Sequence, residues 1–289
     1  MPLLDRSLKV ALVQLAAGAD KVRNLTRAKE HVLEAASNGA QLVVLPECFN
    51  SPYSVAAFPE YAEPIPGQTT TFLSALAKDN SIYLIGGSIP ERDESDGRLY
   101  NTSLSFSPTG ELIAKHRKTH LFDIDIPGKI RFKESDVLTG GSKVTVFDLP
   151  PYGKVGLAIC YDIRFPELAS IAARKDGVFA MIYPGAFNTT TGPMHWDLLG
   201  RARAIDNQIF VLLCSPARDM TAGYHAYGHS VVIDPNASIL AEAGEGEEIV
   251  YAELEAGKIE EFRAGIPVTT QRRHDVYPDL SAMVEPSAL

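Results

Sequence analysis

Three side chains that could do chemistry follow apolar runs of the sequence: Glu47, Cys160 and Asn188. Glu47 follows QLVVLP, Cys160 follows VGLAI, and Asn188 stands a few residues beyond FAMIY. Apolar runs of this length are typical of strands that are covered on both faces of a sheet. Because ligands bind beyond the carboxyl ends of such strands, we expect these side chains to converge although they are far apart in the chain.

Cys160 stands between a predicted strand at residues 154–159 and a predicted helix that opens at RFPEL. A thiol at this joint lies near the positive end of the helix dipole, which favours the thiolate, the form that attacks carbon. The alternative is a buried cysteine that fills a gap at a strand end, and the residues of this stretch alone favour that alternative. The choice therefore depends on the other reactive residues.

Glu47 and Lys118 are candidate partners of the thiol. Partial burial beside the apolar run would raise the pKa of Glu47 toward that of a useful general base, whereas the alternative is a surface carboxylate on a turn. Lys118 belongs to a small basic island, KHRKTH, and such an island is more commonly a solvated face. Its ammonium could instead stabilise the oxyanion that develops when a thiolate adds to a carbonyl.

Histidine is the other candidate base. A pair of Cys160 with His195 or His229 stays open, because such partners meet in the fold rather than in the chain. A G-x-S-x-G elbow, a P-loop and a G-x-G-x-x-G segment after a strand are absent, so serine-hydrolase chemistry and nucleotide binding have no support in the sequence. The three cysteines are widely separated and odd in number, which argues against a disulfide framework and a zinc knuckle.

The formal net charge of the 289 residues is -9, which leaves no electrostatic footprint for nucleic acid or an anionic membrane. We therefore expect a small-molecule ligand, held by a locally positive pocket if that ligand is an anion. The sequence has neither a signal-peptide layout nor an Arg-rich leader, and no apolar run approaches membrane-spanning length. These features predict a cytosolic protein and leave a mitochondrial fraction open.

The order of apolar and amphipathic stretches predicts one layered α/β domain over residues 1–289, with its core at 8–277 and a tail at 278–289. Short apolar or alternating runs predict the strands. The predicted strands are 9–15, 41–45, 82–86, 99–105, 112–116, 144–149, 154–159, 179–183, 209–214, 229–234, 239–243 and 249–254.

Amphipathic spacing predicts a first helix over 24–38, with Asn24 as its N-cap and Gly39 as its stop. A later helix over 195–207 is predicted to bury a stripe of Leu198, Ala202 and Ile205. Residues 121–141 are predicted to form a long functional loop. Further helices are predicted at 70–78, at 258–265 and in the segment that ends before Gly177.

The sequence resembles the nitrilase superfamily of carbon-nitrogen hydrolases in five segments. They are LVVLPECFNSPY, KHRKTHLFDID, FKES, GLAICYDIRFPEL and YPGAFNTTTGP, and the match runs in order from about residue 9 to residue 277. Within the superfamily the sequence is most similar to the omega-amidase branch, through NSPY, HLFDIDIPGKI and AFNTTTGP. The resemblance implies an α-β-β-α sandwich, two sheets flanked by helices, where composition alone would also allow a doubly wound sheet.

The resemblance also implies roles that spacing does not assign. Cys160 would be the nucleophile, Glu47 the general base, and Lys118 the group that stabilises the tetrahedral intermediate. Glu134, in FKES, matches the family's second glutamate, which positions the substrate or assists Lys118. The oxyanion would be held by Lys118 and the backbone N–H of Tyr161, and neither a metal nor an organic cofactor would be needed.

Arg164 stands one helical turn beyond the nucleophile and could offer its planar fork to a carboxylate, whereas a salt bridge to Asp162 or Glu167 is the alternative. Similarity to omega-amidases implies the carboxylate, with three further residues at the substrate: Tyr53, Phe187 and Thr191. The implied substrates are 2-oxoglutaramate and 2-oxosuccinamate. Each would be hydrolysed through a cysteine thioester to a 2-oxo dicarboxylic acid and ammonia.

A deaminated-glutathione amidase is the nearest alternative within the superfamily, and an N-carbamoyl amidase or a nitrilase is a more distant one. A non-catalytic scaffold that kept the fold is the alternative from a different class. The family implies a homodimer, and the candidates for its contact are the helix that starts at His195 and the tail at 272–277. No nucleic-acid or membrane partner is expected.

Overall fold

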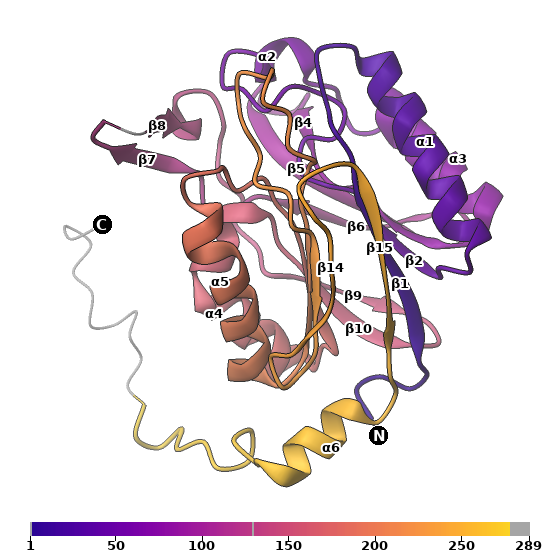
Figure 1. The fold of residues 1–289 in the computed structure, drawn as a ribbon, viewed down its shortest axis with the longest axis vertical. Coiled ribbons are helices and arrows are strands. Elements are labelled where there is room, and N and C mark those ends of the chain that lie inside the picture. Colours follow the sequence, from indigo (N-terminus) through magenta and orange to yellow (C-terminus); the bar gives the residue numbers. More distant parts are fainter. Residues whose placement is uncertain (1, 129, 278–289) are drawn as a thin grey trace.

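Strand β1 (Leu8–Gln14) is covered on both faces, as its apolar run predicts. Val10 and Leu12 pack into one hydrophobic core, whereas Ala11 and Val13 pack into another. Because side chains alternate along a strand, a strand with two apolar faces belongs inside a layered structure. The computed structural model describes residues 2–128 and 130–277 and arranges such strands in two facing sheets (Figure 1).

The first sheet has the strand order β15-β1-β2-β3-β5-β4, and β6 pairs with β5 beside this path. Strands β1, β2 and β3 are parallel to one another, and the other pairs of this sheet are antiparallel. Besides β1, the strands are β2 (Leu42–Val44), β3 (Tyr83–Ile85), β4 (Ile89–Arg92), β5 (Leu99–Phe106), β6 (Leu112–Arg117) and β15 (Glu248–Leu254).

The second sheet has the order β14-β13-β12-β11-β10-β9, with β10, β11 and β12 parallel. Its strands are β9 (Thr145–Leu149), β10 (Gly153–Leu157), β11 (Ala180–Pro184), β12 (Phe210–Cys214), β13 (Val231–Ile233) and β14 (Ile239–Glu242). Each sheet therefore has a parallel centre, and the carboxyl ends of its central strands meet at one edge.

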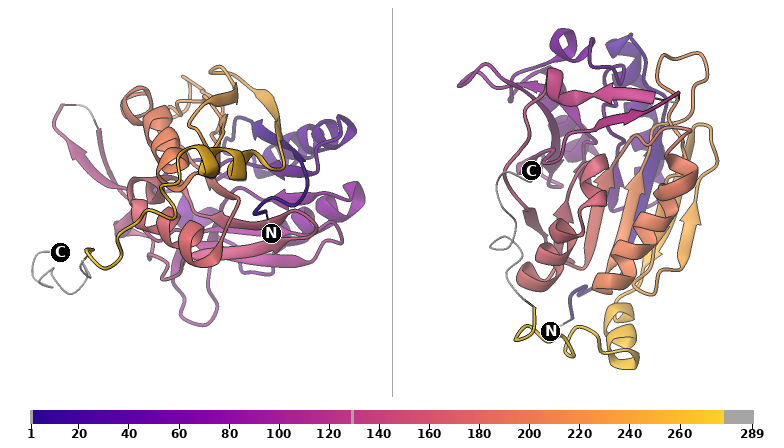
Figure 2. Two further views of the ribbon diagram at one scale, coloured as in Figure 1. Left: turned by 90° about the horizontal axis from the view of Figure 1, so that it is seen from below. Right: turned by 90° about the vertical axis from the view of Figure 1, so that its left-hand side faces the viewer.

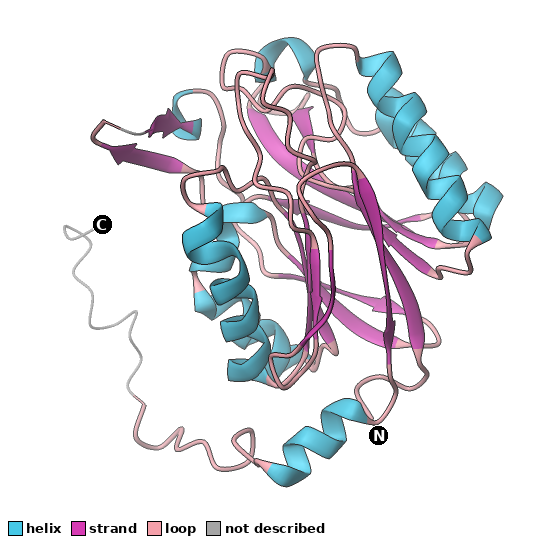
Figure 3. Ribbon diagram, viewed as in Figure 1, coloured by secondary structure: helices cyan, strands magenta, loops and turns pink. Residues whose placement is uncertain are grey.

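Three hydrophobic cores define the layers. One lies between the sheets and joins residues such as Leu12 and Leu212. A second lies between the first sheet and helices α1 (Lys21–Ser37) and α3 (Gln68–Asn80). A third lies between the second sheet and helices α4 (Pro166–Ile171) and α5 (Gly192–Asn207). The predicted α-β-β-α sandwich is thus confirmed, and Figures 2 and 3 show α1 and α5 on opposite sides of the paired sheets.

Most predicted elements are confirmed with shifts of a few residues at their ends, and β4 was missed. Its sequence IPER includes Pro90, which is tolerated because β4 is an edge strand. The predicted long loop at 121–141 is also only partly correct, since it contains a hairpin of β7 (Asp123–Ile126) and β8 (Ile130–Lys133). This hairpin projects from the body of the protein in Figure 1.

The prediction that Asn24 caps α1 is wrong. The helix starts at Lys21, and the Asp20 side chain accepts a hydrogen bond from the Arg23 N–H, which makes Asp20 the N-cap. Asn24 is buried one turn inside the helix, where its amide donates to the Gly18 carbonyl and accepts from the Gly18 N–H. The side chain therefore closes the preceding loop instead of opening the helix.

The predicted buried stripe of α5 is also wrong. Leu198 and Ile205 are exposed, and the helix buries Trp196, Gly200 and Ala204 toward the second sheet. A Cβ atom on Gly200 would lie 2.7 Å from the side chains of Ile233 and Leu213, so the small residue lets the helix approach the sheet closely. The apolar residues of the expected stripe are thereby turned outward.

Two short helices complete the described chain: α2 (Phe58–Tyr61) and α6 (Lys258–Gly265). The helix at 258–265 was predicted with these bounds. Helix α6 lies near the start of the chain, where Glu260 accepts a hydrogen bond of 2.9 Å from the Leu3 N–H. No helix in the described ranges is long and apolar enough to cross a membrane. The predicted tail at 278–289 lies outside the described residues.

Candidate active site

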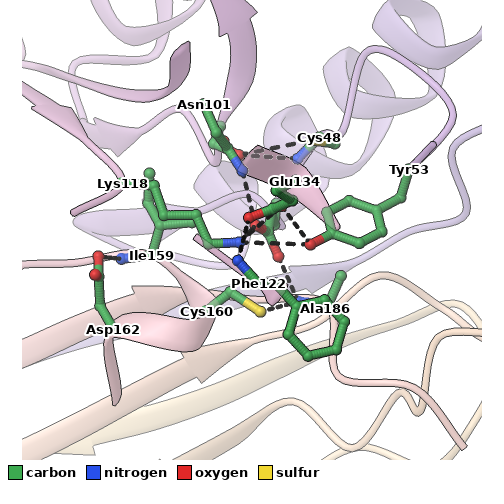
Figure 4. A network of polar contacts seen from close by, with 12 residues as sticks. Cys48, Tyr53, Asn101, Lys118, Phe122, Glu134, Ile159, Cys160, Asp162 and Ala186 are labelled. Carbon is green, nitrogen blue, oxygen red and sulfur yellow. Dashed lines mark hydrogen bonds and ion pairs between the residues drawn. The ribbon is translucent and has the colours of Figure 1, made fainter. Parts of the chain in front are cut away.

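Four of the predicted site residues come together where the central strands of both sheets end. Glu47 follows β2 by three residues, Lys118 follows β6 directly, and Cys160 follows β10 by three residues. Glu134 opens a short 3-10 turn directly after β8. Figure 4 shows the Lys118, Glu134 and Cys160 side chains pointing toward a common centre. The expected convergence of distant residues is therefore observed.

The Lys118 ammonium is the centre of the site. Its Nζ lies 2.9 Å from Glu47 Oε1 and 3.0 Å from Glu134 Oε1, and all three side chains are buried. Asn101 donates from its Nδ2 to the same Glu47 oxygen at 2.8 Å. An ammonium has three N–H groups, and the two glutamates use two of them. The third can donate to the Tyr53 hydroxyl, 3.4 Å from Nζ.

Glu134 is fixed from two sides. Its Oε1 accepts from the Tyr53 hydroxyl at 2.8 Å, and its Oε2 accepts from the Phe122 N–H at 2.7 Å. The hairpin segment that was predicted as a loop therefore delivers a buried carboxylate to the ammonium. In this position Glu134 can orient Lys118.

Cys160 adopts a left-handed backbone conformation, with φ of 45°. For a residue with a side chain this conformation is uncommon, and it is often found at functional sites. The Ala186 N–H donates to Cys160 Sγ at 3.4 Å and to Glu47 Oε2 at 2.8 Å. The preceding Gly185 permits this approach, because a Cβ atom there would lie 3.1 Å from the Cys160 Cα atom and from the Trp196 ring.

Burial and charge set the protonation of the cluster. Burial raises the pKa of Glu47 and outweighs the nearby Lys118 ammonium, which acts in the opposite direction. Burial also acts to lower the pKa of Lys118, but the two glutamates outweigh it and hold that pKa well above its ordinary value. Glu47 can therefore accept and return a proton while Lys118 stays positive.

The expectation that a helix dipole activates the thiol is wrong. Cys160 opens a 3-10 turn of only five residues, Cys160–Arg164. Burial raises the pKa of the Cys160 thiol well above its ordinary value, Glu47 raises it further, and Lys118 acts against them. The resting group is a thiol, so attack requires that its proton leave.

The alternative histidine bases lie elsewhere. His195 Nδ1 is 3.1 Å from an Arg164 nitrogen, and His229 Nδ1 is 3.0 Å from Glu242 Oε1. Asn188 has a structural position, because its Oδ1 accepts from the N–H groups of Thr190 and Thr191 just before α5. Of the candidate bases, Glu47 is therefore the one that the described structure places beside the thiol.

The residues predicted at the substrate divide into two groups. Tyr53 lines a cavity of about 560 Å³ together with Glu47, Cys48 and Ala186. Arg164, Phe187 and Thr191 are not among the lining residues. The Arg164 guanidinium lies 4.8 Å from the centre of the Phe187 ring, and the Thr191 hydroxyl donates to Asn188. Neither of the predicted salt bridges of Arg164 is found among the described ion pairs.

Asn101, Phe132 and Tyr224 belong to the site and were missed. Phe132 stacks on Tyr53 at 5.4 Å between ring centroids, and the Tyr224 ring lies 4.6 Å from the Tyr53 ring. The Tyr224 hydroxyl donates to the Ala186 carbonyl at 2.5 Å. Phe132 and Tyr224 both line the cavity. Tyr53, Phe132 and Tyr224 therefore form an aromatic cluster at the cavity, while the Cys160 side chain is only 3 % exposed.

No three His, Cys, Asp or Glu side chains are grouped to hold a metal ion in the described part of the chain. The fold and the site together define a class: an α-β-β-α sandwich with a thiol, a carboxylate and an ammonium in contact, the groups that acyl transfer to water requires. Comparison with known proteins identifies the family of this chain. The chain belongs to the carbon-nitrogen hydrolase family, whose profile matches residues 9–264.

Relatives with assigned names are similar over nearly the whole chain. The omega-amidase NIT3 of Saccharomyces cerevisiae is 56% identical over 287 residues, 97% of this chain and 98% of that protein. The omega-amidase NIT2 of Homo sapiens is 55% identical over 271 residues, 94% of this chain and 97% of that protein. The crystal structure of S. cerevisiae Nit3, described as a member of branch 10 of the nitrilase superfamily, superposes with a TM-score of 0.87 at 53% identity and covers 94% of this chain and 99% of that one.

Proposed function

We propose that the protein is an omega-amidase. It hydrolyses the terminal amide of 2-oxoglutaramate and of 2-oxosuccinamate to the 2-oxo dicarboxylic acid and ammonia. The observation that carries the proposal is the contact of the Lys118 ammonium with Glu47, next to the Cys160 thiol, in a chain 55% identical to proteins of that activity. We place the reaction in a single domain.

Acylation starts when Glu47 takes the proton of Cys160 and Sγ attacks the amide carbon. A carbon–sulfur bond forms, and the carbonyl π electrons move to oxygen. The third N–H of Lys118, which turns from the Tyr53 hydroxyl to the substrate, and the backbone N–H of Tyr161 stabilise this oxyanion. Tyr161 lies in the first turn of the 3-10 segment, where a backbone N–H has no intrahelical acceptor.

The tetrahedral intermediate then collapses. The carbon–nitrogen bond breaks, and the nitrogen takes the proton from Glu47 and leaves as ammonia. Glu47 next takes a proton from water, whose oxygen attacks the thioester carbon. The carbon–sulfur bond breaks, the thiol regains its proton and the acid leaves. Glu134 holds Lys118 in place throughout, and no cofactor takes part.

We assign the substrate carboxylate to Arg164. Its guanidinium has no carboxylate partner among the described ion pairs, and its Nε has no hydrogen-bond partner in the structure. A planar fork with free N–H groups suits bidentate binding of a carboxylate. Phe187, Thr191 and Tyr53 would shape the pocket around the chain of the substrate. Tyr53 lines the cavity, whereas Arg164 and Cys160 are not among its lining residues.

Homodimer formation through α5 is part of the proposal. Met194 and Leu198 on α5 are 56% and 61% exposed, and Ile171 on α4, the other helix of this layer, is also exposed. Arg272 of the predicted contact tail donates to the Asp206 carbonyl near the end of α5, so the tail extends this surface. We also propose a cytosolic location, which leaves a mitochondrial fraction open. The three free cysteines support it, because free thiols suit a reducing compartment.

Ammonia release from purified protein tests the proposed activity. We expect faster turnover of 2-oxoglutaramate than of deaminated glutathione, measured as kcat/KM for each. A preference for deaminated glutathione would instead assign the protein to that sister activity, which needs a more open pocket. Absence of ammonia release from any linear amide would leave the scaffold alternative.

A further inference from the structure

Lys118 and Cys160 belong to different sheets, and the proposed reaction needs them at a fixed separation. Lys118 follows β6 of the first sheet, whereas Cys160 follows β10 of the second. A buried carboxylate lies between these two segments. It is Asp162, two residues beyond the nucleophile, and it takes part in no step of the proposed reaction.

Asp162 binds the backbone of the segment that connects β10 to α4, next to Cys160. Its Oδ2 accepts from the Ile159 N–H at 2.9 Å, directly before the nucleophile. Its own N–H donates to the Ile159 carbonyl at 3.0 Å. These two bonds close the turn that forces Cys160 into its left-handed conformation.

On the other side, Asp162 holds both flanks of Lys118. Its Oδ2 lies 3.1 Å from His116 Nε2, two residues before the lysine. Its Oδ1 accepts from the backbone N–H and from Nδ1 of His120, both at 2.8 Å and two residues after the lysine. The Thr119 N–H adds a longer bond of 3.4 Å. Residues on both sides of Lys118 in the chain thus bind the Asp162 carboxylate.

The carboxylate is ionised in this setting. Burial acts to raise the pKa of Asp162, but the hydrogen bonds of His116 and His120, together with the Coulomb attraction of His116, outweigh it and hold that pKa well below its ordinary range. An ionised carboxylate can only accept hydrogen bonds, so each facing group must donate. Bonds to a charged acceptor are stronger than neutral ones, which makes the link stiff.

Each histidine ring also makes a second contact, in addition to its bond to Asp162. His116 Nδ1 lies 2.9 Å from the Thr145 hydroxyl on β9, so the ring spans from the first sheet to the second. The His120 ring stacks on Phe165 with its centroid at 3.6 Å. Phe165 belongs to the same segment as the nucleophile, next to the start of α4. The His116 ring therefore links the Lys118 segment to the second sheet, and the His120 ring links it to the segment that carries Cys160.

We propose that Asp162 is a positioning residue, which sets the Lys118 ammonium against the Cys160 thiol by binding the segments that carry them. This rests on the proposed roles of Lys118 and Cys160. It predicts that loss of the Asp162 carboxylate affects the chemical step rather than substrate binding.

The first test is Asp162→Asn, which keeps the shape of the side chain but replaces one acceptor with a donor. We expect kcat for 2-oxoglutaramate to fall on the order of 10- to 100-fold, as for a small misplacement of a catalytic group, with KM little changed. Asp234→Asn is the matched control. Asp234 is also a buried aspartate that accepts backbone N–H groups, from Asn236 and Ser238, but in the β13–β14 turn. A kcat of Asp162→Asn equal to that of the control overturns the proposal.

The second test uses His116, where two amides replace different ring nitrogens. In His116→Gln the side-chain amide reaches the position of Nε2 and can donate to Asp162, whereas in His116→Asn it reaches only the position of Nδ1 and Thr145. We expect His116→Gln to keep most of kcat and His116→Asn to lose it. Equal loss in both would overturn the positioning role, and this pair keeps the proposal testable if Asp162→Asn does not fold.

A substrate-independent measurement separates this inference from the proposed activity. Alkylation of Cys160 by iodoacetamide, followed by mass spectrometry of its peptide, should be at least tenfold slower in Asp162→Asn, because Lys118 no longer supports the thiolate. A merely loosened structure would expose the thiol and react faster, and a rate at or above that of the wild type overturns the inference. If the wild type releases no ammonia from 2-oxoglutaramate while the variant still alkylates slowly, the proposed activity fails and the positioning role stands.

Discussion

Glu47 Oε2 and Cys160 Sγ accept from the same backbone N–H, that of Ala186, at 2.8 and 3.4 Å. A shared donor places the Glu47 carboxylate and the Cys160 sulfur side by side. The proton of the thiol can therefore pass to the carboxylate over a short path. Burial raises the pKa of both groups, so each favours its protonated form more than an exposed carboxyl or thiol would.

Cys160→Ala should abolish ammonia release while the thermal midpoint and the circular dichroism spectrum stay those of a folded protein. Cys214→Ala is the control, since Cys214 is also a free buried cysteine but bonds to the carbonyls of Val13 and Val44, away from Glu47 and Lys118. The control should keep its activity. Turnover by Cys160→Ala would rule out the thioester.

Glu47→Gln should lower kcat by about 100- to 10,000-fold, the range of a lost general base. The amide keeps the volume of the side chain, but one of its termini is a donor that must face Lys118 or the Ala186 N–H. Steady-state kinetics at several pH values check the result. A kcat within tenfold of the wild type would show that another group takes the proton.

Arg164→Lys should cause a large loss of kcat/KM with 2-oxoglutaramate and a smaller one with a neutral linear amide. A lysine keeps the charge but cannot present two parallel N–H groups to a carboxylate. The comparison of the two substrates is the measurement. Equal losses would argue that Arg164 supports the site through Phe187 instead of binding the acid.

The stability of the protein should depend on Asp162 in a defined pH range. The pKa of this carboxyl is lowered in the folded state, so its contribution is complete above the ordinary value of about 3.9 and is lost as the pH falls toward the folded pKa. Urea unfolding should find Asp162→Asn less stable than the wild type by about 1.5 to 3 kcal/mol at pH 7. The difference should shrink below about pH 4. A difference that is constant over this range would contradict the assignment.

Leu198→Glu should weaken the proposed homodimer, because it places a charge on the exposed apolar face of α5. Sedimentation velocity at several concentrations would show a shift toward monomer. Val22→Glu is the matched control, since Val22 is equally an exposed apolar side chain but lies on α1, over the other sheet. Dimers that survive Leu198→Glu and dissociate in the control would locate the contact elsewhere.

The strands and the catalytic groups could be predicted because their signals are local. Covered strands are continuous apolar runs, and Glu47 and Cys160 follow such runs directly. The burial of Lys118 could not be predicted from the sequence. Strand β6 alternates between exposed Lys115 and buried His116, and which of its faces is covered depends on the sheet that packs against it. The role of Lys118 came from the resemblance to a family rather than from the pattern.

The remaining errors have physical reasons that lie in the tertiary structure. Asn101 sits in a buried strand where a polar residue gives no sign of its partner Glu47. Tyr224 acts from a loop more than sixty positions beyond the nucleophile, and its contact with Ala186 depends on the path of that loop. In α5 the small residues Gly200 and Ala204 face the sheet, so hydrophobicity alone selected the wrong side of the helix.

Burial of Cys160 should slow its oxidation. Oxidation of cysteine to sulfenic acid needs a thiolate that solvent can reach, and here the side chain is 3 % exposed and burial raises the pKa of its thiol. Tyr224 binds the Ala186 carbonyl, one peptide unit from the amide whose N–H contacts both Glu47 and Cys160. An exposed reactive cysteine would be open to oxidative inactivation, whereas this sulfur has little contact with bulk solvent in the described structure.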